Sequence, residues 1–321
     1  METKEIKAEE LDPEKFIEEK VEEIRSIVGD AKAIVALSGG IDSSAATMLG
    51  HRGLSDRLRV VFIDNGLMRD GEPEQVASTF KELGVHVEII DAQEEFFEAL
   101  SGITDPEEKR EAITQTFYKK VFGRLVRESG ARFLLQGTIL TDIEETMAGI
   151  KRQHNILEQL GIDTEKEYGY EVIEPLRQLR KDGVRKLAKA LGLPESIWNR
   201  MPFPGPALAA RIIGEVTPEK IEIVRKATAI VEEELKYGGA FQYMAILHLD
   251  RVTGMKEGKR AFGLQIEIRC WESIDAREAT PTKLPFDALE KLAQRITTEV
   301  PGVVSVTYNI TPKPPSTMEA I

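Results

Sequence analysis

The fold is decided by the stretch AIVALSGGIDSS, which runs from Ala33 to Ser44. Its first part, Ala33–Leu37, is wholly apolar, which is typical of a short parallel strand buried on both faces. Ser38 and two glycines then end the apolar run, and a helix is expected to begin near Asp42. The stretch therefore predicts a strand, a glycine loop and a helix, in which the first backbone N–H groups of the helix point to where an anion would bind.

The same alternation of strand and helix continues on both sides of this stretch. Apolar residues recur every three to four positions in 13–28, which predicts an opening amphipathic helix. The further strands and helix that we expect are strands at 58–64, 85–91 and 133–136 and a helix at 72–83. Alternating elements of this kind favour right-handed βαβ units and an α/β fold with a doubly wound parallel sheet.

The pattern changes after a proline-rich segment, Met201–Pro206, which carries three prolines in five positions. Proline lacks a backbone donor and fixes φ, so neither a helix nor a central strand can run through this segment. We expect helices at 218–235 and 285–300 and strands at 241–249, 260–271 and 303–310. The sequence therefore predicts two domains, at 1–203 and 204–321, the second a smaller α+β domain.

Composition limits the classes of function. A formal net charge of −12 argues against a broad basic footprint for nucleic acid. No apolar run approaches the roughly 20 residues that a membrane helix needs, so a cytoplasmic protein is expected. Cys270 is the only cysteine, which excludes an intramolecular disulfide and a cysteine-rich metal site. We expect Cys270 to be a buried strand residue.

The loop Ser38–Ser44 has no Gly-Lys-Ser/Thr of a Walker loop and no GxGxxG of a dinucleotide fold. A turn with a capping Ser or Asp is the simpler interpretation of such glycines. The complete pattern SGGxDS resembles the PP-motif of the ATP pyrophosphatases, in which the loop holds the β,γ-phosphates of ATP. The resemblance implies a pyrophosphate site, with Asp42 available to Mg²⁺, formed by Ser38, Gly39, Gly40, Asp42, Ser43 and Ser44.

Eight motifs occur in order along nearly the whole chain. They are DNGLMR (64–69), TDPEEKR (104–110), QGT (136–138), EPLR (174–177), RKDGVR (180–185), PFPGP (202–206), GEVTPE (214–219) and KPPSTME (313–319). Together they resemble the synthetase subunit of GMP synthases, in its free-standing archaeal form. The resemblance implies a sheet domain like the adenine nucleotide alpha hydrolases and a C-terminal dimerisation and acceptor-binding domain.

The resemblance also implies a reaction and its residues. ATP, as its Mg²⁺ complex, adenylylates the C2 oxygen of XMP, and ammonia then displaces AMP to give GMP. The implied catalytic residues are Asp142 and Lys181, although Lys181 could equally be a solvated charge at a helix start. Asp64 and Gly137 are implied in ATP binding. The implied substrate-binding residues are Lys151, His154, Arg211, Lys313, Thr317 and Glu319.

The partners follow from the same resemblance. No nucleophilic cysteine for a glutaminase is present, since Cys270 falls in an expected strand, so ammonia must come from a separate glutamine amidotransferase subunit or from solution. A homodimer is expected. Neither nucleic acid nor a membrane is expected as a partner.

The chain departs from the family pattern at several positions, which are Gln153, Gly183, Ala207, Arg277, Glu278 and the Met-Glu-Ala-Ile end. Most departures fall in the acceptor half of the resemblance. They leave open a paralogue that adenylylates a different acceptor, and a non-catalytic subunit that senses nucleotides. Asp42, Asp142 and Lys181 remain as candidates for chemistry and argue against the non-catalytic alternative.

Overall fold

The structure, a computed structural model, describes residues 4–147, 170–236, 239–256, 258–274 and 276–320. The chain forms two compact units. The first unit comprises Met1–Ile63, Pro73–Asp91 and Phe117–Arg200, and the second comprises Asp64–Glu72, Ala92–Thr116 and Met201–Ile321. The expected division into domains at residue 203 stays a prediction, because each unit is made of three separate stretches of the chain.

The first unit is built on a five-stranded sheet with the strand order β3-β2-β1-β4-β5. The strands are β1 (Ala33–Ala36), β2 (Leu58–Asp64), β3 (Glu88–Asp91), β4 (Phe133–Leu135) and β5 (Glu171–Ile173). The central strand β1 runs parallel to β2 and to β4, with Val35 opposite Val60 and Leu135. All three residues are buried, which explains the wholly apolar character of the strand. The predicted parallel α/β fold is confirmed.

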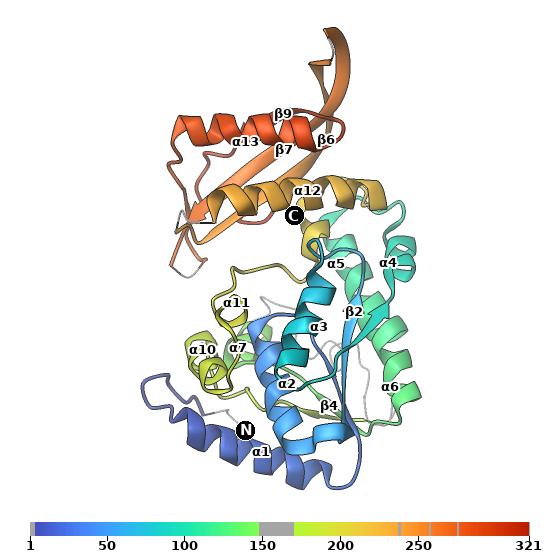
Figure 1. Ribbon diagram of the computed structural model, residues 1–321, viewed down its shortest axis with the longest axis vertical. Helices are drawn as coiled ribbons and strands as arrows, with labels where there is room; N and C mark the ends of the chain where they lie inside the picture. Colours follow the sequence, from blue (N-terminus) through green and yellow to red (C-terminus); the bar gives the residue numbers. More distant parts are fainter. Residues whose placement is uncertain (1–3, 148–169, 237–238, 257, 275, 321) are drawn as a thin grey trace. The chain divides into compact units, whose positions relative to one another are not determined.

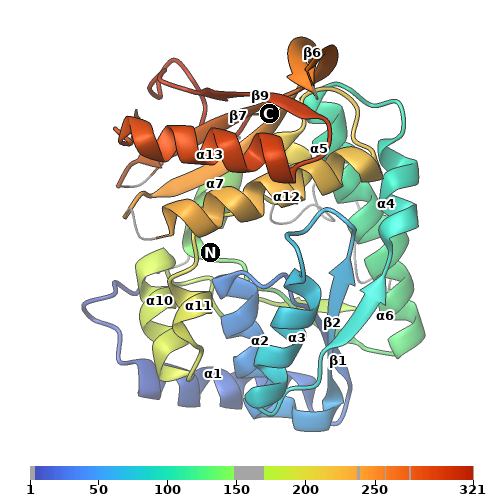
Figure 2. The same cartoon turned by 45° about the horizontal axis from the view of Figure 1, so that its top comes forward.

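Helices α1 (Pro13–Val28), α2 (Ile41–Leu54) and α10 (Lys181–Ala190) contact one another and form one layer beside the sheet (Figures 1 and 2). Helix α1 begins where the Asp12 carboxylate accepts a hydrogen bond from the Lys15 backbone N–H, and it ends at Gly29, whose φ is 55°. The other helices among the described residues of this unit are α3 (Glu72–Glu82), α6 (Gly123–Ser129), α7 (Leu140–Met147) and α11 (Glu195–Trp198), together with the 3₁₀ turn η1 (Ser55–Arg57) and the π-helical segment η2 (Thr116–Phe122).

The second unit packs two helices, α12 (Pro218–Leu235) and α13 (Phe286–Glu299), against a sheet (Figure 1). Its strands are β6 (Gln242–Lys256), β7 (Lys259–Glu272), β8 (Thr280–Pro281) and β9 (Val303–Tyr308). Strand β7 pairs antiparallel with β6 and β8 and parallel with β9. Helices α4 (Gln93–Leu100) and α5 (Pro106–Gln115) and the 3₁₀ turn η3 (Ala207–Arg211) complete the unit.

Most expected elements are present with small shifts of their ends. Helices at 13–28 and 218–235 and the strand at 58–64 have the expected bounds. The strand expected at 241–249 is longer, because β6 continues to Lys256 in a hairpin with β7. Strands β5 and β8 were not predicted, since they have three and two residues and show no periodicity. Cys270 is buried in β7, as expected.

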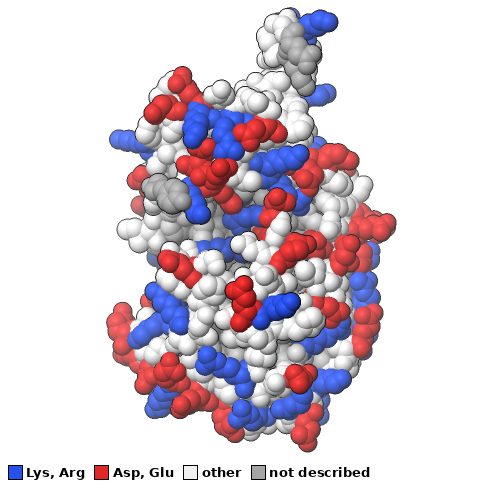
Figure 3. All heavy atoms as spheres, viewed as in Figure 1, with Lys and Arg blue, Asp and Glu red and all other residues white. Residues whose placement is uncertain are grey.

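Acidic and basic side chains are interspersed on the face that Figure 3 shows. Arg295 of α13 forms ion pairs with Glu233 and Glu234 of α12 and with Glu299 of its own helix. None of the helices among the described residues is both long and apolar enough to cross a membrane.

We predict that Gly50→Ala lowers the free energy of unfolding by about 1–3 kcal/mol, because α2 lies directly on the sheet there. A Cβ at Gly50 would lie 2.4 Å from Leu135 Cδ2 and 3.0 Å from Leu58 Cδ2. Gly183→Ala in α10 is the matched control, since its Cβ would lie 3.4 Å from the nearest atom and the change should stabilise by about 0.5–1 kcal/mol. Urea denaturation of both variants measures the difference, and equal effects would contradict this packing.

Candidate active site

The loop between β1 and α2 is ordered by its own serines. The Ser38 and Ser43 hydroxyl oxygens lie 2.9 Å apart, and the Ser38 backbone N–H donates to Ser43 Oγ at 3.2 Å. Ser43 Oγ in turn donates to the Gly40 carbonyl at 3.1 Å. Gly39 has a φ of 73°, which a residue with a side chain rarely adopts. These contacts hold Ser38–Ser44 in the turn from which α2 starts.

The first turn of α2 fits an anion. Gly40 is the N-cap residue, and no side chain among the described residues caps the helix. The side chain of Ser44 is fully buried, and its hydroxyl has no hydrogen-bond partner in the described part of the chain. The uncapped backbone N–H groups and the helix dipole together attract negative charge. This geometry suits a phosphate, and the predicted contacts of Ser38–Ser44 with pyrophosphate stay predictions.

Gly137 lies against this turn from the loop after β4. A Cβ at Gly137 would lie 2.7 Å from the Asp42 carbonyl carbon and 2.8 Å from the Ser43 nitrogen. Any side chain there would displace the backbone of α2 at its start. The structure therefore gives Gly137 a steric role beside the loop and places it with the other predicted ATP-binding residues of the first unit.

Two cations reach the same loop. Lys181, the first residue of α10, places its Nζ 2.6 Å from Asp42 Oδ2, and both side chains are partly exposed. Arg200 Nη1 donates to the Gly39 carbonyl at 3.1 Å. Positive charge beside a helix N-terminus adds to the attraction for phosphate. The structure thus brings Lys181 to the loop despite a separation of 139 residues from Asp42.

Asp142 has a structural task that the sequence did not reveal. Its Oδ2 accepts a hydrogen bond from the Ile139 backbone N–H at 3.1 Å, at the start of α7. A short-range contact of this kind stabilises the beginning of a helix. Its predicted catalytic role stays a prediction.

Asp64, at the end of β2, belongs to the second unit. Its carboxylate accepts from the Gly66 backbone N–H at 2.9 Å and from Gln93 Nε2 at 2.8 Å. Gly66 has a φ of 72°. These bonds stabilise the turn at the start of the DNGLMR motif, and the predicted ATP contact of Asp64 stays a prediction.

A magnesium ion would be bound by the Asp42 carboxylate and by the phosphate oxygens of ATP. Among the described residues, no group of three or more His, Cys, Asp or Glu side chains could hold a metal ion. Mg²⁺ is commonly bound through one or two carboxylates together with substrate phosphates. Asp42, in the first turn of α2, therefore suits a metal that arrives with ATP.

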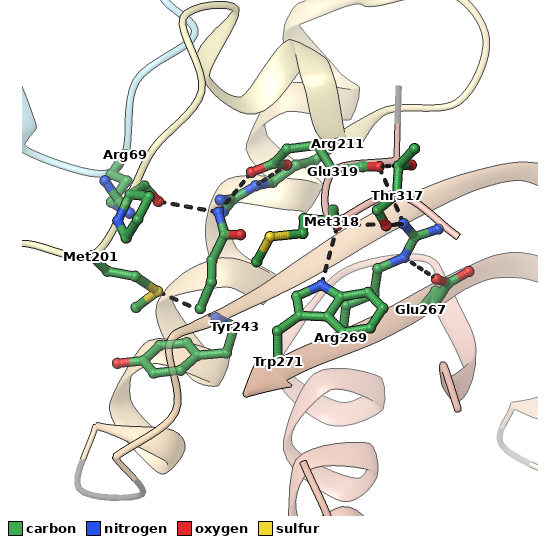
Figure 4. A network of polar contacts seen from close by, with 12 residues as sticks. Arg69, Met201, Arg211, Tyr243, Glu267, Arg269, Trp271, Thr317, Met318 and Glu319 are labelled. Atoms are coloured by element: carbon green, nitrogen blue, oxygen red, sulfur yellow. Dashed lines mark hydrogen bonds and ion pairs between the residues drawn. The ribbon is translucent and has the colours of Figure 1, made fainter. Parts of the chain in front are cut away.

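A second cluster of polar side chains lies in the second unit (Figure 4). Arg211 is fully buried at the end of η3, and its Nε lies 3.4 Å from Glu319 Oε2. Glu319 Oε1 accepts from Gln242 Nε2 at 2.8 Å. The guanidinium groups of Arg69 and Arg211 lie over the Phe203 ring, at 3.9 and 4.9 Å from its centroid. We call these five residues the acceptor cluster.

Some guanidinium nitrogens of the acceptor cluster make no hydrogen bond to the described residues. Arg69 Nε lies 2.6 Å from Glu232 Oε1, and Arg69 Nη1 lies 3.9 Å from Glu72 Oε2, too far for a hydrogen bond. Arg69 Nη1, Arg211 Nη1 and Arg211 Nη2 therefore have no hydrogen-bond partner among the described residues. Burial lowers the pKa of Arg211, and the neighbouring charge of Arg69 lowers it further, against the opposing effect of Glu319. Unused guanidinium donors around a ring are suited to a phosphate or another planar anion.

Sequence reasoning found Arg211, Thr317 and Glu319 of this region but not Arg69, Phe203 or Gln242. Arg69 and Phe203 lie in the DNGLMR and PFPGP motifs, so the motifs were the available signal for them. Gln242 lies at the start of β6, outside every quoted motif. Lys313 Nζ donates to the Ala276 carbonyl at 2.7 Å, and its predicted contact with substrate stays a prediction. Lys151 and His154 lie outside the described residues.

The departures from the family pattern lie in different surroundings, and Gln153 lies outside the described residues. Ala207 has a φ of 53°, the left-handed region in which glycine costs nothing and another residue costs about 1–2 kcal/mol. Gly183 is buried inside α10, where an added Cβ would come no closer than 3.4 Å to its nearest neighbour, Leu179 Cδ2. Arg277 and Glu278 are exposed. None of these sites removes a member of the acceptor cluster.

Lys109 of the TDPEEKR motif is a further buried charge in the second unit. Its side chain is almost fully buried, and its Nζ donates to the Ile212 carbonyl at 2.9 Å, next to Arg211. Burial lowers its pKa from 10.5 to about 8, and the charge of Lys220 adds to the effect. Lys109 therefore ties α5 to the end of η3, which carries Arg211.

Known proteins resemble both halves of the chain. A family model described as GMP synthase C terminal domain matches residues 229–320, and one described as NAD synthase matches residues 11–206. A protein of Archaeoglobus fulgidus, named as one of the subunits of a glutamine-hydrolyzing GMP synthase, is 52% identical over 309 residues, which cover 96% of this chain and 99% of that protein. The chain belongs to this family of GMP synthase subunits.

Further members of the family agree. The Pyrococcus furiosus protein of the same name is 52% identical over 309 residues, with 95% of this chain and 97% of that protein covered. The Methanopyrus kandleri protein of the same name is 49% identical over 320 residues, with 96% and 99% covered. The predicted family is confirmed, and the similarity spans nearly the whole of both units.

The lowered pKa of Lys109 predicts a pH dependence of stability. Between pH 8 and pH 10.5 the unfolded chain keeps a proton that the folded chain has released, so the free energy of unfolding rises with pH. Lys109→Met removes the titrating group. From about pH 7.5 to about pH 9.5 the free energy of unfolding of wild type should therefore rise by about 1–2 kcal/mol relative to that of the variant. Urea denaturation at both pH values measures this change, and a constant difference would show that Lys109 titrates normally.

Proposed function

We propose that the chain catalyses the ATP-dependent amination of XMP to GMP, with release of AMP and pyrophosphate. It is a ligase that forms a carbon–nitrogen bond. The observation that carries the proposal is the identity of about half of all residues with these GMP synthase subunits over nearly the whole chain. The uncapped start of α2, after the loop Ser38–Ser44, suits the phosphates of the ATP that this reaction consumes.

In the proposed reaction the first unit binds the pyrophosphate part of ATP. The N–H groups at the start of α2 and the Ser38, Ser43 and Ser44 hydroxyls surround the β,γ-phosphates. Lys181 and Arg200 neutralise negative charge that gathers as pyrophosphate departs. Mg²⁺ held by Asp42 would polarise the phosphate oxygens. Lys181 Nζ lies 2.6 Å from Asp42 Oδ2, beside the carboxylate that would hold the ion.

The second unit binds the acceptor. Arg69 and Arg211 supply donors with no hydrogen-bond partner among the described residues, and a nucleotide phosphate would fill them. Phe203 keeps the two guanidinium planes in place through its ring. Glu319 and Gln242 present further hydrogen-bonding groups at the same cluster. A small dianionic nucleotide such as XMP matches this set of groups.

The proposed chemistry proceeds in two steps. The C2 oxygen of XMP attacks the α-phosphorus, the bond to the bridging oxygen of the β-phosphate breaks, and pyrophosphate leaves. Ammonia then adds to C2, loses a proton, and expels AMP together with the former C2 oxygen. Adenylylation turns a poor leaving group into a good one, and the protein contributes mainly position and electrostatic stabilisation.

Ammonia is proposed to come from a separate glutamine amidotransferase subunit. The relatives are each named as one subunit of a glutamine-hydrolyzing enzyme, and Cys270, the one cysteine, is buried within β7. Burial raises the pKa of the Cys270 thiol, which makes it a poor nucleophile. We place the reaction in the cytoplasm, where its nucleotide substrates are available.

A homodimer is also proposed. The hairpin of β6 and β7 exposes the apolar side chains of Leu249, Met255 and Phe262, each at least 60% exposed. Exposed apolar side chains grouped on one hairpin favour a protein contact. Sedimentation should find a dimer at micromolar concentration, and a chain that sediments only as a monomer would contradict this part of the proposal.

The function is tested by incubating the purified chain with Mg-ATP and ammonium, with and without XMP, and measuring pyrophosphate and GMP in the same samples. We expect both products only when XMP is present, in equal amounts. Pyrophosphate release that is independent of XMP, or none with XMP, would favour the alternative of another acceptor.

A further inference from the structure

One buried side chain binds the backbone of three successive residues near the C-terminus. Arg269 on β7 is 9% exposed, and its Nη1 donates to the carbonyls of Thr317 at 2.9 Å, Glu319 at 3.2 Å and Met318 at 3.4 Å (Figure 4). Three successive carbonyls thus converge on one nitrogen. A guanidinium that binds three carbonyls restrains the backbone of all three residues.

Arg269 is itself held in one orientation. Its Nε lies 2.5 Å from Glu267 Oε1, two residues earlier on the same face of β7. Glu267 also accepts from Asn309 Nδ2 at 3.0 Å and interacts with His248 Nε2 at 2.7 Å. Burial raises the pKa of Glu267, but the hydrogen bonds from Arg269 and Asn309 outweigh it and the pKa is lowered. Glu267 therefore keeps its charge and fixes the guanidinium plane.

The side chains of the same tail residues point to different places. Met318 packs in a buried cluster with Met244, Ile246, Trp271 and Ala279. Trp271 Nε1 donates to the Met318 carbonyl at 3.2 Å. Glu319, the next residue, directs its carboxylate to Arg211 and Gln242 of the acceptor cluster. The hydrogen bonds from the Arg269 side chain to the backbone of the tail therefore position the carboxylate of Glu319.

We propose that Arg269 is a positioning residue that holds the C-terminal tail so that Glu319 stays in the acceptor cluster. Without this restraint, the tail would release Glu319, and Arg211 would be left fully buried without its carboxylate, an arrangement that is strongly unfavourable. The consequence for catalysis rests on the proposed function, because it assumes that the acceptor cluster binds XMP.

The geometry requires a guanidinium and not merely a positive charge. Arg269 uses Nε for Glu267 and Nη1 for the three carbonyls at the same time. A lysine has one nitrogen at the end of a flexible stem and cannot span both partners in a fixed plane. Arg269→Lys should therefore lose part of the restraint although it keeps the charge.

The first arm of the test reports the tail directly and does not depend on substrate. Carboxypeptidase digestion of the intact protein should remove the C-terminal residues of Arg269→Met at least tenfold faster than those of wild type, and Arg269→Lys should be intermediate. Arg260→Met, an exposed arginine on the same strand, is the matched control and should digest at the wild-type rate. Wild-type resistance in both Arg269 variants would overturn the proposal.

The second arm reports catalysis. Arg269→Met and Arg269→Lys should each raise KM for XMP about tenfold or more and leave KM for ATP within about twofold. A chain that ends at residue 315 lacks the restrained tail. Adding either Arg269 substitution to that truncated chain should therefore not raise its KM for XMP further. Equal losses for ATP and XMP, or additive effects with the truncation, would show a general folding defect and overturn the proposal. If the Arg269 variants are digested fast but the wild-type protein does not turn over XMP, the restraint by Arg269 is supported and the proposed function is rejected.

Discussion

The first unit depends on the burial of β1 in the middle of its sheet. Because β1 pairs with β2 on one side and β4 on the other, its four residues must be apolar and its chain must leave at one edge. The exit is the turn of Ser38–Ser44, and Gly137 closes on that turn so tightly that a Cβ would touch the backbone of Asp42. The start of α2 is therefore fixed before any ligand arrives, which lowers the cost of binding an anion there.

In the second unit the corresponding constraint is the burial of Arg211. A buried guanidinium is stable only with a carboxylate and hydrogen bonds near it. Glu319 supplies the carboxylate, Arg269 fixes the tail that carries Glu319, and Lys109 holds the carbonyl next to Arg211. Unused donors remain after these contacts, and this residual capacity is what a nucleotide anion would use.

The sequence predicts these features to different depths, for physical reasons. Helix α12 was found with its true ends because Thr217 caps it, Pro218 starts it and its apolar residues follow the helical period. The turn Ser38–Ser44 was found because a local motif defines it. Strands β5 and β8 were missed because two or three residues show no period, whereas the equally short β4 is wholly apolar and buried. Contacts between distant residues were harder still: Gln242 meets Glu319 across 77 residues, and Lys109 meets Ile212 across 103, so no spacing rule relates them.

The central claim, that the C2 oxygen of XMP is adenylylated, is tested most directly with XMP that carries ¹⁸O at C2. In a turnover with Mg-ATP and ammonium, the account predicts that each AMP formed carries one ¹⁸O on its phosphate and that pyrophosphate carries none. Unlabelled AMP formed together with GMP would contradict the account, because the C2 oxygen would then have left by another route.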